Sequence, residues 1–229
     1  MWALLGAMEI EIKEFLKRLE EKTETGEGDF RFFRGRIAGR EVLVGKTGVG
    51  KVLAALTTQK IIDTYKPEAI LFTGLAGSLK KEMDVGDTLI AQDCVQWDLD
   101  ARVFGFKRGT IPYTRRRYIS GDAKLLEAAS SYVPKTGSLH FGRIVTGDTF
   151  IKNSETEEYS FLRKELDGWA VEMEGAGVAL TAAVNSIPCL LIRIISDKAD
   201  GKAPLSFLKF VAKASKLGYD AAVHIMEKS

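Results

Sequence analysis

The sequence predicts a single α/β domain over residues 1–229, built around a mixed β-sheet. Apolar runs rich in Val, Ile and Leu alternate with amphipathic stretches along the whole chain. This pattern is typical of strands that are buried on both faces and covered by helices. The 229 residues suffice for one large domain, and we find no internal repeat or interdomain linker. A content of 45% hydrophobic and 28% charged residues excludes a disordered chain and a membrane bundle.

Strands are expected wherever a short apolar run is bounded by turn residues. The segment Asp29–Val44 is predicted to form a hairpin, because Phe30, Phe32 and Val42 alternate with polar residues around a turn at Ala38–Arg40. A hairpin next to buried parallel strands makes the sheet mixed. The other predicted strands are Trp2–Gly6, Glu41–Gly45, Ala69–Gly74, Asp87–Gln92, Phe141–Thr146, Trp169–Met173 and Pro188–Ser196.

Helices are expected in the amphipathic stretches between these strands. They are predicted at Glu9–Glu21, Lys51–Tyr65, Asp122–Tyr132, Glu155–Leu166, Gly175–Ser186 and Leu205–Met226. The segment Trp97–Tyr118 has no convincing period and reads as a long excursion, and long ordered loops are usually functional. Its arginine triplet, Arg115–Arg117, is interpreted as a solvated face rather than a contact for a polyanion.

The charge balance and the cysteine count narrow the classes of partner. With 33 basic and 31 acidic residues, the net charge of +2 supplies no broad basic field, so nucleic acid is not expected as a partner. Cys94 and Cys189 are too far apart in sequence to form a C-x-x-C motif, which indicates a reducing, cytoplasmic location. The apolar run at Trp2–Leu5 is too short to span a bilayer, so no membrane association is expected.

Two glycine-containing segments are candidate ligand loops. The segment Gly45–Val52 fits the first part of a phosphate-binding Walker A loop, but Val52 stands where a hydroxyl would hold Mg²⁺. It therefore reads either as a tight strand-to-helix turn or as a turn brought close to a small ligand. The segment Thr73–Ser78 is predicted to be a turn at the carboxyl end of a strand, where ligands collect in open α/β sheets.

Carboxylates beside apolar strands are the more informative candidates, because burying them is costly without a partner or a function. Period-2 alternation places Glu172 and Glu174 on one face of a strand. Arg193 interrupts a later apolar strand and Asp197 closes it; for Arg193 the structural alternative is a buried ion pair with Glu172 or Glu174. If the two strands are parallel, Glu174 and Asp197 reach the same edge of the sheet.

The first helix offers two further acids, and geometry alone does not choose between them. Glu9 and Glu11 both flank its apolar stripe, and both are favoured there by the helix dipole whatever their function. His140 and His224 have no metal-ligand spacing with each other or with the cysteines, and neither is close in sequence to a candidate nucleophile. We therefore expect neither a metal site nor histidine catalysis.

Six ordered motifs give the chain a specific resemblance. They are Leu5–Glu11, Gly48–Val52, Thr73–Gly77, Gly147–Ile151, Val171–Glu174 and Ile195–Asp200. In this order they resemble the nucleoside phosphorylase superfamily, and most closely its hydrolytic branch, the 5'-methylthioadenosine/S-adenosylhomocysteine nucleosidases. The resemblance covers nearly the whole chain. It implies a partly barrel-like mixed sheet flanked by helices, no metal or organic cofactor, and a homodimer.

The resemblance also implies a reaction, in which water cleaves the N-glycosidic bond of an adenine nucleoside carrying a 5'-thio substituent. Asp197 matches the general acid at adenine N7, and Ser196 beside it matches a purine-binding residue that holds that contact. Glu11 matches the carboxylate that activates the water. Glu174, Met173 and Arg193 match ribose-binding residues, and Arg193 matches a residue that is also close to the water and the acids. Adenine would stack on Phe150 and be read by the backbone of Ile151.

The 5'-substituent would occupy an apolar pocket. The residues that match this pocket are Met8, Val49, Phe207 and, from the partner subunit, Ala101, Phe104 and Pro112. The aperiodic loop would thus be a dimer element. Three positions depart from the family pattern: Leu75 replaces a serine near the water, Ser78 replaces a glycine, and Ala101 replaces a larger apolar residue.

Three alternatives stay open. A looser 5' pocket would admit futalosine-type nucleosides, which are bulkier on that side. A phosphorylase of the same fold would place phosphate where water is expected, but an anion at Glu11 favours water and repels phosphate. A nucleoside-binding protein without turnover is the non-catalytic alternative, and the retained Glu11, Glu174 and Asp197 argue against it.

Overall fold

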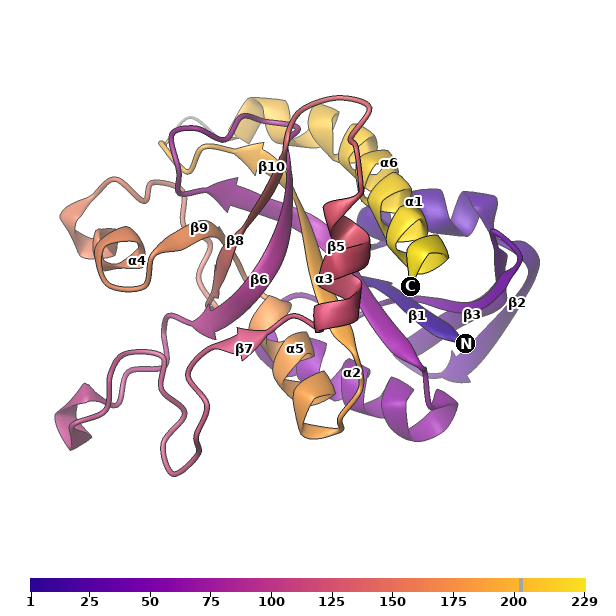
Figure 1. Cartoon of the computed structure of the whole chain (residues 1–229), viewed down its shortest axis with the longest axis horizontal. Helices are drawn as coiled ribbons and strands as arrows, with labels where there is room; N and C mark the ends of the chain where they lie inside the picture. The colour runs from indigo at the N-terminus through magenta and orange to yellow at the C-terminus, as the bar shows by residue number, and fades with distance from the viewer. Residues whose placement is uncertain (202–203) are drawn as a thin grey trace.

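The computed structural model describes residues 1–201 and 204–229, except for the side chains at 204–209, 211 and 212. In this part of the chain ten strands form one continuous sheet, with helices on both of its faces (Figure 1). The strands are β1 Trp2–Gly6, β2 Glu20–Glu27, β3 Phe30–Ile37, β4 Arg40–Lys46, β5 Ala69–Ser78, β6 Thr88–Gln96, β7 Ile119–Ser120, β8 Leu139–Thr146, β9 Gly168–Glu172 and β10 Cys189–Asp197. The α-helices are α1 Glu9–Arg18, α2 Lys51–Tyr65, α3 Ala123–Ser130, α4 Phe161–Lys164, α5 Gly175–Val184 and α6 Pro204–Lys228.

Part of the sheet closes on itself. The strand order is β10-β6-β8-β9-β5-β1-β4-β3-β2, and β10 also pairs with β5. Strands β10, β6, β8, β9 and β5 therefore form a closed ring, while β1 to β4 extend from β5 as an open sheet. The expectation of a mixed, partly barrel-like sheet flanked by helices is confirmed.

Buried parallel strands form the centre of the sheet. Strand β1 lies between β4 and β5 and is parallel to both, with Leu4 opposite Val44 and Leu71. All five residues of β1 are buried, which is why this strand is apolar without alternation. Helices α1, α3 and α6 pack together over one face, and α2 and α5 lie side by side over the other (Figure 1).

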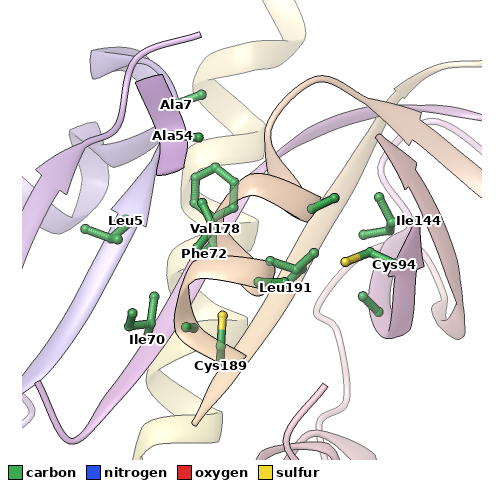
Figure 2. Close-up of a cluster of buried hydrophobic side chains, with 14 of the residues drawn as sticks. Leu5, Ala7, Ala54, Ile70, Phe72, Cys94, Ile144, Val178, Cys189 and Leu191 are labelled. Atoms are coloured by element: carbon green, nitrogen blue, oxygen red, sulfur yellow. The ribbon is translucent and has the colours of Figure 1, made fainter. Parts of the chain in front are cut away.

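Apolar side chains fill the space between the sheet and these helices. Figure 2 shows Leu5, Ile70 and Leu191 of three different strands near Val178 of α5. A second buried cluster lies under α1, α3 and α6 and includes Phe15 and Ile225. The core is thus split by the sheet into two layers, which leaves the strand ends free to carry polar residues. None of the helices, over the residues described, is long and apolar enough to cross a membrane.

The first helix ends earlier than predicted. Helix α1 stops at Arg18, and Glu20–Glu27 forms strand β2, where no strand was expected. Every residue of β2 is at least partly exposed, so it has no apolar alternation to mark it. Its backbone pairs with β3 as an edge strand, and this pairing leaves little trace in side-chain character.

Two other predictions were wrong. The segment Thr73–Ser78 is not a turn but the second half of strand β5, which pairs with β10 and with β9. The predicted helix Glu155–Leu166 is replaced by a short 3₁₀ turn at Glu157–Tyr159 and the single turn of α4. Amphipathic spacing alone did not reveal that this connection stays short.

Candidate functional site

A cavity of about 300 Å³ opens where β1, β5, β9 and β10 end. Its lining combines apolar side chains with a few convergent carboxylates, which is the usual character of a small-molecule site. The lining residues are Ala7, Met8, Glu11, Val49, Leu75, Ala76, Gly77, Thr149, Phe150, Ile151, Val171, Glu172, Met173, Glu174, Ser196 and Asp197.

Strand β5 forms the floor on which the acids meet. A Cβ at Gly74 would lie 2.9 Å from Glu11 Oε1, and a Cβ at Gly77 would lie 3.1 Å from Asp197 Oδ1. Gly77 also pairs with Val171 of β9 on its other side. The two glycines thus give the carboxylates of Glu11 and Asp197 room to approach the backbone.

The prediction that parallel strands deliver Glu174 and Asp197 to one edge was right in its result but wrong in its reason. Strand β10 is parallel to β5, whereas β9 is antiparallel to it. The two acids line the same cavity because the sheet closes as a barrel. Strands β9 and β10 therefore approach the end of β5 from its two sides.

Glu11 is held by three backbone N–H groups. Its Oε2 accepts hydrogen bonds from Ala7 at 2.8 Å and Met8 at 2.9 Å, and its Oε1 accepts one from Leu75 at 3.0 Å. Burial raises the pKa of Glu11, although the Arg193 guanidinium and these N–H groups oppose the rise. Glu9, the other acid that sequence geometry left open, is exposed and does not line the cavity.

Glu174 also lines the cavity and is hydrogen-bonded to the start of α2. Its Oε1 accepts a 2.9 Å hydrogen bond from the backbone N–H of Gly50, which has a φ of 89°. Burial and the neighbouring Glu172 carboxylate raise the pKa of Glu174 to about 7. This group therefore changes charge close to neutral pH.

Glu172, which lines the cavity, forms a buried ion pair with Arg193, which does not line it, as the structural alternative for Arg193 predicted. Arg193 Nη2 lies 2.7 Å from Glu172 Oε2. The same carboxylate oxygen accepts hydrogen bonds from the backbone N–H groups of Glu174 at 3.1 Å and Gly175 at 2.7 Å. Its other oxygen accepts one from the hydroxyl of Thr146. The pair thus fixes the turn that carries Glu174.

Asp197 is the last residue of β10 and has both oxygens engaged. Oδ2 accepts a hydrogen bond from the Ser196 hydroxyl at 2.8 Å, and Oδ1 accepts one from the Ala199 backbone N–H at 2.8 Å. The β10–β5 register shifts between Ile195 and Asp197. This irregularity lets Ser196 and Asp197, adjacent in sequence, both line the cavity.

The structure brings most of the predicted site residues to this one cavity. The lining includes Met8, Val49, Phe150, Ile151 and Met173 beside the three acids. Arg193 is fully buried and does not line the cavity. Ala101, Phe104 and Pro112, expected from a partner subunit, lie in the excursion between β6 and β7 and do not line the cavity of their own chain. Phe207 is in α6, and its side chain lies outside the described residues.

Sequence reasoning missed the groups that hold these acids in place. The hydroxyl of Thr146 and the N–H of Gly50 are examples, and neither carries a pattern that separates it from other threonines and glycines. A salt bridge between Lys51 and Asp98 was also missed, because the two residues belong to segments far apart in sequence.

Other reactive groups are placed away from this chemistry. Cys94 and Cys189 are buried, and burial raises the pKa of both thiols, that of Cys189 to about 12. The His140 ring is hydrogen-bonded to the Asp87 carboxylate, and the His224 ring to the Ser131 hydroxyl. Within the described ranges, no group of three or more His, Cys, Asp and Glu side chains is arranged to hold a metal ion.

Fold and site together define an α/β barrel-type protein with a carboxylate-lined ligand cavity at the strand ends. The chain belongs to the phosphorylase superfamily, whose family model matches residues 2–227. It is 36% identical over 217 residues to a 5'-methylthioadenosine/S-adenosylhomocysteine nucleosidase of Staphylococcus haemolyticus, covering 94% of each chain. The resemblance inferred from the sequence motifs is therefore confirmed.

Solved structures agree with this assignment. The nucleosidase of the same name from Neisseria meningitidis, in complex with methylthio-immucillin-A, has a TM-score of 0.92 and 32% identity, with 100% of this chain and 99% of that chain covered. A futalosine hydrolase mutant of Helicobacter pylori has a TM-score of 0.91 and 31% identity, with the same coverage.

Proposed function

We propose that this protein is an N-glycosidic hydrolase that converts 5'-methylthioadenosine and S-adenosylhomocysteine into adenine and the corresponding 5-thioribose; 5'-deoxyadenosine is a further candidate substrate. The observation that carries this proposal is the placement of Glu11, Glu174 and Asp197 on one apolar cavity of nucleoside size. The curated relative and the Neisseria meningitidis structure described above carry the name of this activity. The proposed enzyme comprises residues 1–229 as one nucleosidase domain.

Asp197 is the proposed general acid. Adenine is a poor leaving group as an anion, so protonation at N7 lowers the barrier to cleavage of the glycosidic bond. The Ser196 hydroxyl and the Ala199 N–H fix the two oxygens of Asp197, which limits the directions in which the carboxyl can rotate. Ser196 thus orients the carboxyl group of Asp197 toward the adenine ring.

Glu11 is the proposed base for the attacking water. The hydrogen bonds that it accepts from three backbone N–H groups hold the carboxylate rigidly at the cavity wall. Burial raises its pKa, and a more basic carboxylate accepts a proton from water more readily. The proton passes from water to Glu11 as the new bond forms at the anomeric carbon. The Arg193 guanidinium lies behind this wall and opposes the rise in the Glu11 pKa.

Glu174 and Met173 are the proposed sugar-binding residues. A carboxylate accepts hydrogen bonds from vicinal hydroxyls, and the ionised form also stabilises the positive charge that develops on the ribosyl ring. The hydrogen bond from Gly50 directs Glu174 into the cavity. Glu172 and Arg193 support it from behind, so we assign Arg193 to positioning the acids.

Phe150 and Ile151 are the proposed purine contacts. Phe150 is 62% exposed in this chain, which leaves a ring face free to stack on a planar base. Ile151 is buried beside it, and its backbone offers a donor and an acceptor to the edge of adenine. Met8, Val49 and Phe207, with Ala101, Phe104 and Pro112 of the partner subunit, form the proposed pocket for the 5'-substituent.

A homodimer is the proposed assembly. Helix α2 exposes Val52, Leu53 and Leu56, and its neighbour α5 exposes Val184. Large apolar side chains gathered on adjacent helices favour burial against a second copy. Phe104, 76% exposed in the excursion between β6 and β7, would be covered in the same assembly.

We place this enzyme in the cytoplasm, in nucleoside catabolism and methionine salvage.

A futalosine-type nucleosidase is the second candidate, favoured by the similarity to the Helicobacter pylori futalosine hydrolase mutant. Incubation with methylthioadenosine, adenosylhomocysteine and a futalosine-type nucleoside, with and without phosphate, separates the alternatives. We expect adenine and a free 5-thioribose by mass spectrometry, at a rate independent of phosphate. A ribose 1-phosphate product would instead identify a phosphorylase. Binding without any cleavage would identify a nucleoside-binding protein.

A further inference from the structure

The lysine of the Walker A-like segment has no role in the mechanism above, yet its side chain is largely buried and contacts two carboxylates. Lys51 is the first residue of α2, and its side chain is 15% exposed. Its Nζ forms a salt bridge with Asp98 and lies 3.7 Å from Asp148 Oδ2. An amine with two carboxylate neighbours inside its own chain is poorly placed to bind a phosphate, so this motif needs another explanation.

Lys51, Asp98 and Asp148 form a closed network, which we name the Lys51 clamp. The backbone N–H of Lys51 donates to Asp148 Oδ1 at 2.8 Å. The backbone N–H of Asp148 donates to Asp98 Oδ2 at 2.9 Å, and the other oxygen of Asp98 accepts the Lys51 amine. Each member thus contacts both others, and the network joins three segments: the start of α2, the segment just after β6 and the loop after β8.

The members of the clamp do not line the cavity, but each of two of them is close in sequence to a residue that contacts or lines it. Asp148 lies two residues before Phe150, on the side proposed for the purine. Gly50, next to Lys51, donates its N–H to Glu174 on the side proposed for the sugar. A Cβ at Gly50 would lie 3.3 Å from Asp148 Oδ1. Gly50, which binds Glu174, and Asp148, which precedes Phe150, therefore lie next to each other.

From this geometry we infer that Lys51 is a positioning residue, which sets the distance between the purine loop at 147–151 and the Gly50–Glu174 contact. This inference rests on the proposed function for its kinetic consequence only. The physical reason is charge balance. Without the amine, the side chain at the start of α2 no longer contacts either carboxylate. The carboxylates of Asp98 and Asp148 then face each other unneutralised, and their repulsion displaces the loop at 147–151.

The test compares four variants with the wild type. Lys51→Met removes the charge and keeps most of the apolar stem; Lys51→Arg restores the charge. Lys51→Met/Asp98→Asn removes the amine and one of the opposing carboxylates together. Lys17→Met, at an exposed position on α1, is the matched control.

The first readout needs no substrate. Hydrogen–deuterium exchange of the ligand-free protein over residues 147–151 reports directly on the loop. We expect at least roughly tenfold faster exchange in Lys51→Met, partial recovery in Lys51→Arg and in the double variant, and no change in Lys17→Met. Exchange in Lys51→Met equal to that of the wild type would overturn the inference, whatever reaction the protein catalyses.

The second readout is kinetic and uses methylthioadenosine. Because the clamp does not touch reacting atoms, Lys51→Met should raise KM roughly tenfold and change kcat less than about threefold, and the double variant should recover part of the KM. A loss confined to kcat, or a double variant whose KM is no lower than that of Lys51→Met, would overturn it. Competitive inhibition by inorganic phosphate that disappears in Lys51→Met would also overturn it, because Lys51 would then bind an anion. If the wild type itself cleaves no nucleoside, the proposed function fails while the exchange result still decides the clamp.

Discussion

The carboxylate of Glu174 and the backbone N–H of Gly50 are joined by a 2.9 Å hydrogen bond that spans 124 positions of the chain. This contact connects the turn after β9 to the N-terminus of α2, where an anion is favoured by the helix dipole. It lowers the pKa of Glu174, but burial and the Glu172 carboxylate outweigh it and raise that pKa to about 7. Glu174 is therefore a group whose charge changes with pH near neutrality in this site.

The first prediction concerns the pH profile. If ionised Glu174 stabilises the ribosyl cation, kcat/KM should fall below about pH 7 by up to tenfold per pH unit as Glu174 becomes protonated. Rates of adenine release measured between about pH 5 and pH 9 test this, with Glu174→Gln as the comparison, which should be slow and lack the acidic limb. An acidic limb of the same slope and midpoint in Glu174→Gln would assign the effect to another group.

The same pKa predicts how stability depends on pH. A carboxyl whose folded pKa lies above its ordinary value of 4.5 binds a proton more tightly in the folded protein. Its contribution to the unfolding free energy therefore declines as pH rises from 4.5 to about 7, by roughly 3 kcal/mol at most. Urea denaturation should show Glu174→Gln gaining stability relative to the wild type between about pH 5 and pH 8. A constant difference would contradict the raised pKa.

A third prediction concerns the ion pair between Arg193 and Glu172. Both side chains are almost fully buried, so removing one partner leaves a charge without compensation. Arg193→Met should lower the unfolding free energy by about 3–5 kcal/mol, and Glu172→Gln should also be destabilising. The double variant should recover part of the loss. Chemical denaturation of all four proteins measures the coupling, and strictly additive losses would show that the pair has no special role.

The proposed dimer gives a fourth prediction. Leu56 is 55% exposed on α2, so Leu56→Asp should leave the folded subunit intact while placing a charge in the interface. Light scattering after size exclusion should show monomers for this variant and dimers for the wild type. Val133→Asp, at an 81% exposed position after α3, is the control and should remain dimeric. A monomeric wild type would exclude the partner residues from the 5' pocket.

Several parts of the fold were predictable because buried strands leave a strong apolar signal. Strand β1 at Trp2–Gly6 and helix α2 at Lys51–Tyr65 match their predicted bounds. Strand β2 was missed because its exposed side chains contribute nothing to the core. The second half of β5 was mistaken for a turn, since Gly74 and Gly77 read as turn residues when their actual use is to admit two carboxylates.

The candidate site shows a similar division. The acids stood out, because carboxylates next to apolar strands are rare enough to notice. The choice of Glu11 over Glu9 came from family resemblance, and the structure gives it a physical basis in three backbone N–H donors. The Lys51 clamp could not be predicted from the sequence, because its side chains come from three segments that only the folded chain brings together.

In the proposed reaction, Glu11 and Asp197 act on one nucleoside from the two sides of the glycosidic bond, Glu11 on the water and Asp197 on the adenine. The deciding measurement is the rate of adenine release from methylthioadenosine by Glu11→Gln and Asp197→Asn, each checked for native folding by circular dichroism. We expect each isosteric change to lower kcat by roughly a hundredfold to a thousandfold, because it removes proton transfer and leaves the shape of the cavity unchanged. A folded variant of either kind that releases adenine at the wild-type rate would show that its carboxylate is not required for cleavage and would overturn the proposed mechanism.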